Sequence, residues 1–159
     1  MSSEFQLVPL LMLAPVLLAV GYFDLRYLRI PNILSLIGLG IFALTFPLLG
    51  WSETGARLLI AAAVLLVGTL AFAARLFGGG DVKILSVLML FIPSGSLMLY
   101  SWGFSAAMML GILFVLVLRR TPVVRHSSWK GIRSKGKFPM GISIALSGLV
   151  HPIAVQLVS

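Results

Sequence analysis

Long apolar stretches, separated by short polar segments, dominate the sequence. A helix that crosses a bilayer needs about 20 mostly apolar residues. Four uncharged stretches have roughly this length: Leu7–Phe23, Ile30–Leu49, Leu58–Ala74 and Met140–Val158. Each of these stretches predicts a transmembrane helix.

A fifth apolar stretch, Val82–Leu118, has Lys83 as its only charge and is too long for a single span. Residues 93–96 within it, Pro-Ser-Gly-Ser, favour a turn. We therefore predict a short span that ends near Ile92 and a full span at Leu97–Leu118. The whole chain is then predicted to be an all-α integral membrane protein, a bundle of six transmembrane helices.

The distribution of charge supports six spans and orients them. The chain has 12 Lys and Arg residues, and the cytoplasmic loops of membrane proteins are enriched in both types. With six spans, the loops at 24–29, 75–83 and 119–139 share one side and contain every basic residue except Arg57. Without a turn at 93–96, the third loop would lie on the opposite side. We therefore predict that these loops are cytoplasmic and that both termini are periplasmic.

The composition narrows the class of protein further. Apolar residue types make up 60% of the chain and charged residues 10%, whereas a soluble domain carries about 25% charged residues. This excludes an ordinary soluble enzyme, a disordered segment and a coiled coil. The absence of cysteine excludes disulfides, thiolate nucleophiles and Cys-ligated metal sites. The length predicts a single domain over residues 1–159.

The predicted topology sorts the four acidic residues. Glu4 and Glu53 fall on the outer side, whereas Asp24 ends the first span and Asp81 opens the fourth, both on the inner side. Ionisable groups near hydrocarbon usually face the bundle interior or a water-filled cavity. Two carboxylates held close together share a proton, so one acts as general base on a water and the other as general acid. This chemistry needs no metal, cofactor or cysteine.

Asp24 also has a plainer interpretation. It could pair with Arg26 or Arg29 and solvate the end of its helix, as boundary charges usually do. The two arginines lie three residues apart and would share a helix face if the first helix extends that far. They would then hold Asp24 ionised, bind lipid phosphate or, most simply, keep their loop in the cytoplasm.

Asp81 follows three glycines, Gly78, Gly79 and Gly80, which allow unusual dihedrals and a close approach of the backbone. Small residues at span interfaces let helices pack tightly, which would bring Asp81 toward Asp24. The alternative is a flexible turn with a polar end. A phosphate-binding loop is excluded because the run lacks the G-x-x-x-x-G-K-S/T spacing, and a dinucleotide site is excluded because the βαβ context is missing.

Two segments resemble a known family. Asp24–Asn32 (DLRYLRIPN) and Phe77–Lys83 (FGGGDVK) are similar to the D…R-x-IPN and FGxGD segments of the aspartic prepilin peptidases, which are polytopic GxGD-type proteases. The similarity covers about residues 10–150. The resemblance implies that Asp24 and Asp81 form the catalytic pair, with the three glycines as the supporting loop.

The chain departs from the larger members of that family in two ways. Those members carry an N-terminal cytoplasmic domain with paired CxxC motifs, linked to N-methylation of the mature pilin, and this sequence has no cysteine. We therefore expect peptidase activity without methyltransferase activity, as in the short enzymes of tight-adherence (Flp) pilus systems. The last span opens with Pro139-Met140-Gly141, which is similar to the family's Pro-aromatic-Gly start but has Met140 at the aromatic position.

Several residues near the aspartates are candidates for binding or orienting the substrate. Besides the two arginines these are Pro31, Asn32 and Lys83. Proline suits a first helical turn, so Pro31 should begin the second span. Asn32 either caps that helix or forms a hydrogen bond near the site. Lys83 is two residues from Asp81, a spacing that separates side chains on a helix, and it is expected to anchor its helix at the interface.

The histidines support no metal chemistry. His151 lies about 15 Å along the last span from the inner face, too deep to meet the aspartates, and we expect it to mark a kink with Pro152. His126 lies in the basic loop without ligands at zinc spacing. We expect no cofactor and no metal. The loop 119–139 should attract anionic lipids, and it contains no recognisable nucleic-acid-binding module.

Together these features predict a membrane aspartic endopeptidase. It would remove the leader from prepilin or pseudopilin substrates at the cytoplasmic face of a bacterial inner membrane, alongside pilus or secretion machinery. One rival is another GxGD protease, which cuts within a transmembrane helix; the IPN segment and the place of Asp24 argue against it. The other rival is a small transporter in which the aspartates relay protons.

Overall fold

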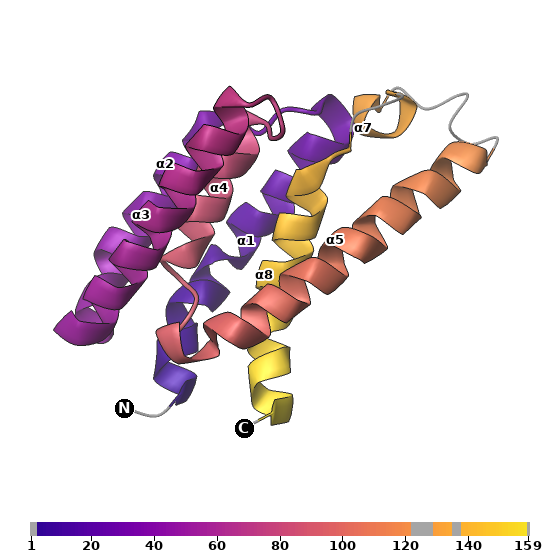
Figure 1. Cartoon of the computed structure of the whole chain (residues 1–159). Coiled ribbons are helices and arrows are strands. Elements are labelled where there is room, and N and C mark those ends of the chain that lie inside the picture. The colour runs from indigo at the N-terminus through magenta and orange to yellow at the C-terminus, as the bar shows by residue number, and fades with distance from the viewer. Residues whose placement is uncertain (1–2, 122–128, 135–137, 159) are drawn as a thin grey trace.

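The computed structural model describes residues 3–121, 129–134 and 138–158, and this part of the chain is helical. Six helices run alternately up and down through the bundle (Figure 1). They are α1 (Ser3–Tyr27), α2 (Asn32–Thr45), α3 (Trp51–Ala73), α4 (Gly79–Met89), α5 (Leu97–Arg120) and α8 (Met140–Val158). The shorter elements are η1 (Phe46–Leu48), η2 (Ser94–Ser96) and α7 (Lys130–Arg133).

Each predicted span corresponds to one of the six helices, and the predicted turn at residues 93–96 separates α4 from α5. Four helices are long and apolar enough to cross a membrane: Gln6–Tyr27, Trp51–Ala73, Ser94–Arg120 and Met140–Val158. The apolar helix Asn32–Leu48 is shorter, and α4 has only 11 residues. The all-α membrane fold is therefore confirmed, whereas six crossings with periplasmic termini stay a prediction.

The core lies where α1, α4 and α8 meet. Helix α1 packs against α8 and α2, α4 packs against α3, α2 and α8, and α5 packs against α8. One face of α1 is fully buried along its length, and its residues follow helical spacing: Leu10, Leu13, Leu17 and Val20. Gly148 of α8 permits this close packing, because a Cβ there would lie 2.7 Å from Leu17 Cδ1.

Large apolar side chains also cover the outside of the bundle. Examples on α1 and α3 are Leu11, Leu18, Leu59, Leu66 and Leu70, which are between 58% and 74% exposed. In water such a surface would drive aggregation, whereas in a bilayer it faces lipid. The bundle is therefore built for a membrane.

Helix α3 corrects the prediction for the third span. It begins at Trp51 rather than at Leu58, so Arg57 lies inside the helix and is completely buried. Arg57 Nε donates a 2.8 Å hydrogen bond to Glu53 Oε1, one helical turn earlier. Because these opposite charges neutralise each other, the helix can carry both into the bundle, which the spacing of uncharged residues alone did not predict.

Arg57 also compensates for the short α4. Its guanidinium donates hydrogen bonds to the carbonyl oxygens of Phe91 and Gln6, each at 3.2 Å, and to that of Leu90 at 3.4 Å. Carbonyls freed by the end of a helix are costly in an apolar environment unless they find a donor. Glu53 completes the network by accepting hydrogen bonds from the backbone N–H (2.8 Å) and the hydroxyl (2.6 Å) of Ser94.

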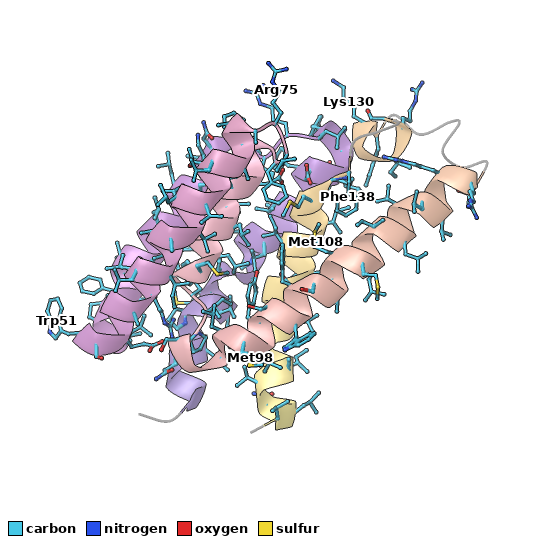
Figure 2. All side chains as sticks on the ribbon, viewed as in Figure 1. Trp51, Arg75, Met98, Met108, Lys130 and Phe138 are labelled. Carbon is cyan, nitrogen blue, oxygen red and sulfur yellow. The ribbon has the colours of Figure 1, made fainter. Side chains whose placement is uncertain are left out.

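The two ends of the bundle differ in character. In Figure 2, Arg75 and Lys130 lie at one end, whereas Trp51 and Met98 lie at the other. The start of α1 and the end of α8 share the second end (Figure 1). Three basic residues of the loop 119–139 lie outside the described residues: Arg125, Lys135 and Lys137. His126 lies outside them as well.

Candidate active site

Asp24 lies in the last turn of α1 and is only 5% exposed. The helix ends three residues later, at Tyr27, and Leu28 takes the left-handed conformation with φ 52°. This conformation is unusual for a residue with a side chain. It turns the chain toward Pro31, which precedes α2, so the end of α1 and the start of α2 border one cleft.

A backbone group of α8 holds Asp24. The N–H of Gly141, at the start of α8, donates a 2.6 Å hydrogen bond to Asp24 Oδ2. A Cβ at position 141 would lie 2.8 Å from both the Cβ and Oδ2 of Asp24, so this contact requires glycine. Free N–H groups in the first turn of a helix favour a negatively charged partner. Sequence reasoning gave Gly141 no role, although its Pro-x-Gly context at the start of a span was a usable signal.

Asp81 lies in the first turn of α4, directly after Gly78, Gly79 and Gly80. A Cβ on Gly78 would lie 2.6 Å from Asp81 Oδ2. A Cβ on Gly80 would lie 3.2 Å from the Cβ and 3.4 Å from the carbonyl oxygen of Ile30. The glycines therefore serve close approach: Gly78 leaves space for the carboxylate and Gly80 for the segment before α2.

The prediction that this glycine run adopts unusual backbone dihedrals is wrong. Gly78 has φ −77° and ψ 141°, which any residue can adopt, and Gly79 and Gly80 are helical. Among the described glycines, positive φ occurs at Gly50, where the chain enters α3. The requirement for glycine in the run comes from packing and not from backbone dihedrals.

Both aspartates line a single cleft of about 370 Å³. It lies between the end of α1, the start of α2 and the start of α4, and each of the two aspartates contributes to its wall. Asp81 Oδ1 is buried without a hydrogen-bond partner among the described residues. The predicted site residues that also line the cleft are Arg29, Asn32, Gly78, Gly79, Gly80 and Lys83.

The two arginines near Asp24 behave differently from each other. Arg26 is exposed, donates a hydrogen bond to the hydroxyl of Tyr22 and lies over the rings of Tyr22 and Tyr27. Arg29 follows the end of α1 and lines the cleft. They therefore do not share a helix face, and the partner of the Asp24 carboxylate is a backbone N–H rather than Arg26.

Asn32 and Lys83 meet at the edge of the cleft. Lys83 Nζ donates a 3.1 Å hydrogen bond to Asn32 Oδ1, which links α4 to α2. Of the two alternatives for Asn32, the structure therefore shows the hydrogen bond near the site, because Pro31 occupies the N-cap position of α2. Pro31 precedes the helix by one residue instead of opening it.

The histidine on α8 lies at the other end of the bundle. His151 Nε2 is 2.9 Å from the hydroxyl of Ser96, which precedes α5, and its ring packs edge-on against Tyr100. No group of three or more His, Cys, Asp or Glu side chains that could hold a metal ion occurs within the described residues. The chemistry that the cleft offers is that of two carboxylates in a largely apolar bundle.

A comparison with known protein families assigns this arrangement. The model of the type IV leader peptidase family matches residues 11–119, which contain both aspartates and the glycine run. The chain belongs to the type IV leader peptidase family. A type IV leader peptidase is a protease that acts on prepilin-like substrates, and the four long apolar helices make this one a membrane protein. Searches of curated proteins and of solved structures found no match.

Proposed function

We propose that this leader peptidase removes the N-terminal leader from type IV or Flp prepilin-like proteins, with Asp24 and Asp81 as the catalytic pair. The observation that carries the proposal is the shared cleft, which brings together carboxylates that are 57 residues apart in sequence. Asp24 is held by the Gly141 N–H, and Asp81 keeps one oxygen free of hydrogen bonds to the described residues. A water molecule between them would have an acceptor on each side.

The reaction follows from one proton shared by two carboxylates. The ionised carboxylate takes a proton from water as the water oxygen bonds to the carbonyl carbon, and the neutral carboxylate donates a proton to the carbonyl oxygen. The carbon–nitrogen bond then breaks as the leaving nitrogen takes the proton that came from water. A hydroxyl of the tetrahedral intermediate returns a proton to the other carboxylate, which restores the shared proton. The pair titrates as a unit, so the proposal assigns the two roles to the dyad and not to individual residues.

The proposed site faces the cytoplasm of a bacterial inner membrane. The cleft lies at the end of the bundle where Arg75 and Lys130 also lie (Figure 2). Basic residues favour the cytoplasmic side, so with six crossings this end would face the cytoplasm. The loops at 24–29 and 75–83 border the cleft, and both termini would then lie in the periplasm. We also propose the peptidase-only form, because these 159 residues contain no cysteine for CxxC motifs.

Co-expression with candidate prepilins tests the proposal. Leader removal is followed by the shift in prepilin mobility, and the new N-terminus is sequenced. Asp24→Asn and Asp81→Asn should each abolish cleavage while the protein level in the membrane stays unchanged. Normal processing by either variant would refute the dyad. Cleavage within the substrate's transmembrane helix, or proton flux without cleavage, would support the two rival functions instead.

A further inference from the structure

Two grooves flank α4, and each of them reaches the cleft. The first, here called the Asp81 groove, has a volume of about 280 Å³ and runs between α3, α4 and the start of α8. Its wall includes Ala63, Val64, Gly68, Asp81, Leu85 and Met140. The second, the Lys83 groove, has a volume of about 570 Å³ and runs between α2, α3 and α4. Its wall includes Asn32, Leu36, Ala62, Leu65, Lys83 and Val87.

We propose that the Asp81 groove binds the first turns of the substrate's apolar helix, directly after the cleaved peptide bond. This inference rests on the proposed function, since it assigns a place to the substrate of the same site. We expect the substrate to present its leader on the cytoplasmic side with its hydrophobic helix in the membrane, so the enzyme must hold a peptide bond at the aspartates while that helix stays in the bilayer. The groove for that segment should therefore begin at a catalytic carboxylate.

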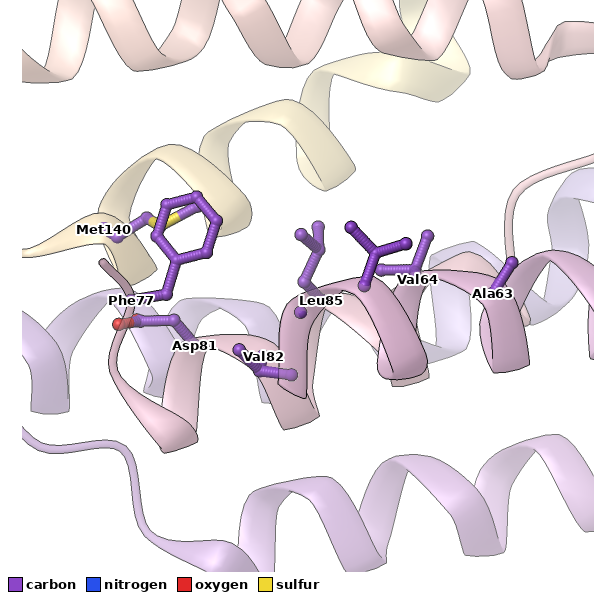
Figure 3. A pocket seen from close by; sticks show the side chains of 9 residues that line it. Ala63, Val64, Phe77, Asp81, Val82, Leu85 and Met140 are labelled. Atoms are coloured by element: carbon purple, nitrogen blue, oxygen red, sulfur yellow. The ribbon is translucent and has the colours of Figure 1, made fainter. Parts of the chain in front are cut away.

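The Asp81 groove meets this requirement. Among the described residues that line it, Asp81 is the only charged one, and the others are apolar. Figure 3 shows Asp81 at one end of the groove with Phe77 and Met140, while Leu85, Val64 and Ala63 continue the wall away from the carboxylate. An apolar helix that starts at the cleaved bond would thus meet the carboxylate first and apolar side chains afterwards.

The start of α8, which forms one wall of the Asp81 groove, also connects the groove to Asp24. Met140 lines the groove, and the next residue, Gly141, donates the hydrogen bond that holds Asp24. A chain that leaves the groove past Met140 therefore approaches both carboxylates. On the other side of α4, the described residues that the Lys83 groove shares with the cleft are Lys83 and Asn32, and neither is an aspartate. These two side chains are hydrogen-bonded to each other at 3.1 Å across that junction.

The length of the groove limits how much of the substrate it holds. Asp81 and Leu85 are four residues apart on α4, or about 6 Å along the helix axis, and Gly68 and Ala63 on α3 are about 7.5 Å apart. One helical turn rises about 5.4 Å, so the groove accommodates about one to one and a half turns. Lipid is as apolar as the groove, so close packing rather than hydrophobicity must select the bound segment.

Two adjacent alanines of α3 allow a matched test. Ala63 lines the Asp81 groove and Ala62 lines the Lys83 groove, and both are exposed, so a larger side chain at either position leaves the core intact. Cleavage rates of a prepilin that the wild type processes are measured against substrate concentration in proteoliposomes. Ala63→Trp should raise KM about tenfold with kcat within about threefold of wild type, and Ala62→Trp should stay within about twofold in both.

Three outcomes would overturn the inference. One is an increase in KM with Ala62→Trp but not with Ala63→Trp, which places the substrate in the Lys83 groove. Another is unchanged kinetics in both variants. The third is an equal loss with a short substrate that contains the cleavage site but lacks the apolar segment, because the tryptophan would then act on the carboxylates. A wild type that cleaves no prepilin would instead refute the proposed function itself.

Crosslinking provides a second measurement. The chain has no cysteine, so Ala63→Cys or Ala62→Cys introduces a single thiol, here in the inactive Asp81→Asn background. A prepilin with one cysteine in the first turn after the cleavage site should form a disulfide with the first variant and not with the second. Crosslinking to the second variant alone, or to neither, would contradict the proposed position of the substrate.

Discussion

The backbone N–H of Gly141 donates a 2.6 Å hydrogen bond to Oδ2 of Asp24, across 117 residues of sequence. This bond joins the start of α8 to the end of α1 at the cleft. A backbone N–H, and not a side chain, therefore orients one carboxylate of the proposed pair. The geometry therefore makes position 141 sensitive to any added atom.

We expect Gly141→Ala to lower kcat by about tenfold or more with little change in KM, because the new Cβ would displace the Asp24 carboxylate and not the substrate. Gly148→Ala is the matched control on the same helix, since its Cβ would crowd Leu17 and Leu88 in the core instead. That control should lower the melting temperature but leave kcat of the folded protein near the wild-type value. Equal kcat losses in the two variants would show that α8 packing explains both effects.

The glycine run should show a graded response to alanine. Gly79→Ala is expected to retain activity within about twofold, because its Cβ would make only an ordinary 3.4 Å contact with the Phe72 ring. Gly78→Ala should lose about tenfold or more, since its Cβ would fall 2.6 Å from Asp81 Oδ2. Gly80→Ala should lie between them, because it crowds Ile30. Leader cleavage in membranes at matched protein levels measures this order, and a run that tolerates alanine equally at all three positions would contradict it.

The buried charges at the far end of the bundle should control stability. Arg57→Met leaves Glu53 without its ion-pair partner and removes a donor from the Leu90 and Phe91 carbonyls after α4, so we expect a loss of about 3–5 kcal/mol. The double variant Glu53→Gln, Arg57→Met should recover part of this loss, because no unpaired charge remains. Thermal unfolding in detergent measures both changes. An Arg57→Met variant as stable as the wild type would show that the network is dispensable.

The proposed topology can be tested with reporter fusions. A reporter fused at residue 130 should be cytoplasmic, and one inserted at residues 93–96 should be periplasmic. The prediction follows from six crossings and from the cluster of basic residues around the cleft. Reporters on the same side of the membrane at both positions would exclude it.

The sequence allowed the helices to be predicted because apolar length is a local property. The prediction failed at the start of α3, where Arg57 interrupts the uncharged stretch. Its charge is neutralised by Glu53, and it donates hydrogen bonds to carbonyls of α1 and of the segment after α4. Only one of those partners is near Arg57 in sequence. A buried charge of this kind therefore depends on tertiary contacts that hydropathy does not include.

The sequence also predicted part of the candidate site: the two aspartates, but not the backbone group that holds Asp24. Asp24 and Asp81 stood out because acidic residues are scarce and their flanking segments resemble known motifs. Gly141 did not, because a backbone donor has no chemical signature in the sequence. For the glycine run, the sequence allowed both dihedral freedom and close approach, and only the structure distinguished them, since Gly78 has an ordinary negative φ.

The Arg57 network also has a consequence for how the protein is made. Synthesis proceeds from the N-terminus, so α3 leaves the ribosome before Leu90 and Phe91, whose carbonyls Arg57 requires. Until they arrive, the guanidinium must remain hydrated, and α3 should enter the bilayer together with α4 as a hairpin. Nascent chains that end before residue 90 should therefore insert α3 less efficiently than chains that extend beyond residue 96. Inserting α4 in this hairpin would also bring Asp81 to the cleft that it shares with Asp24.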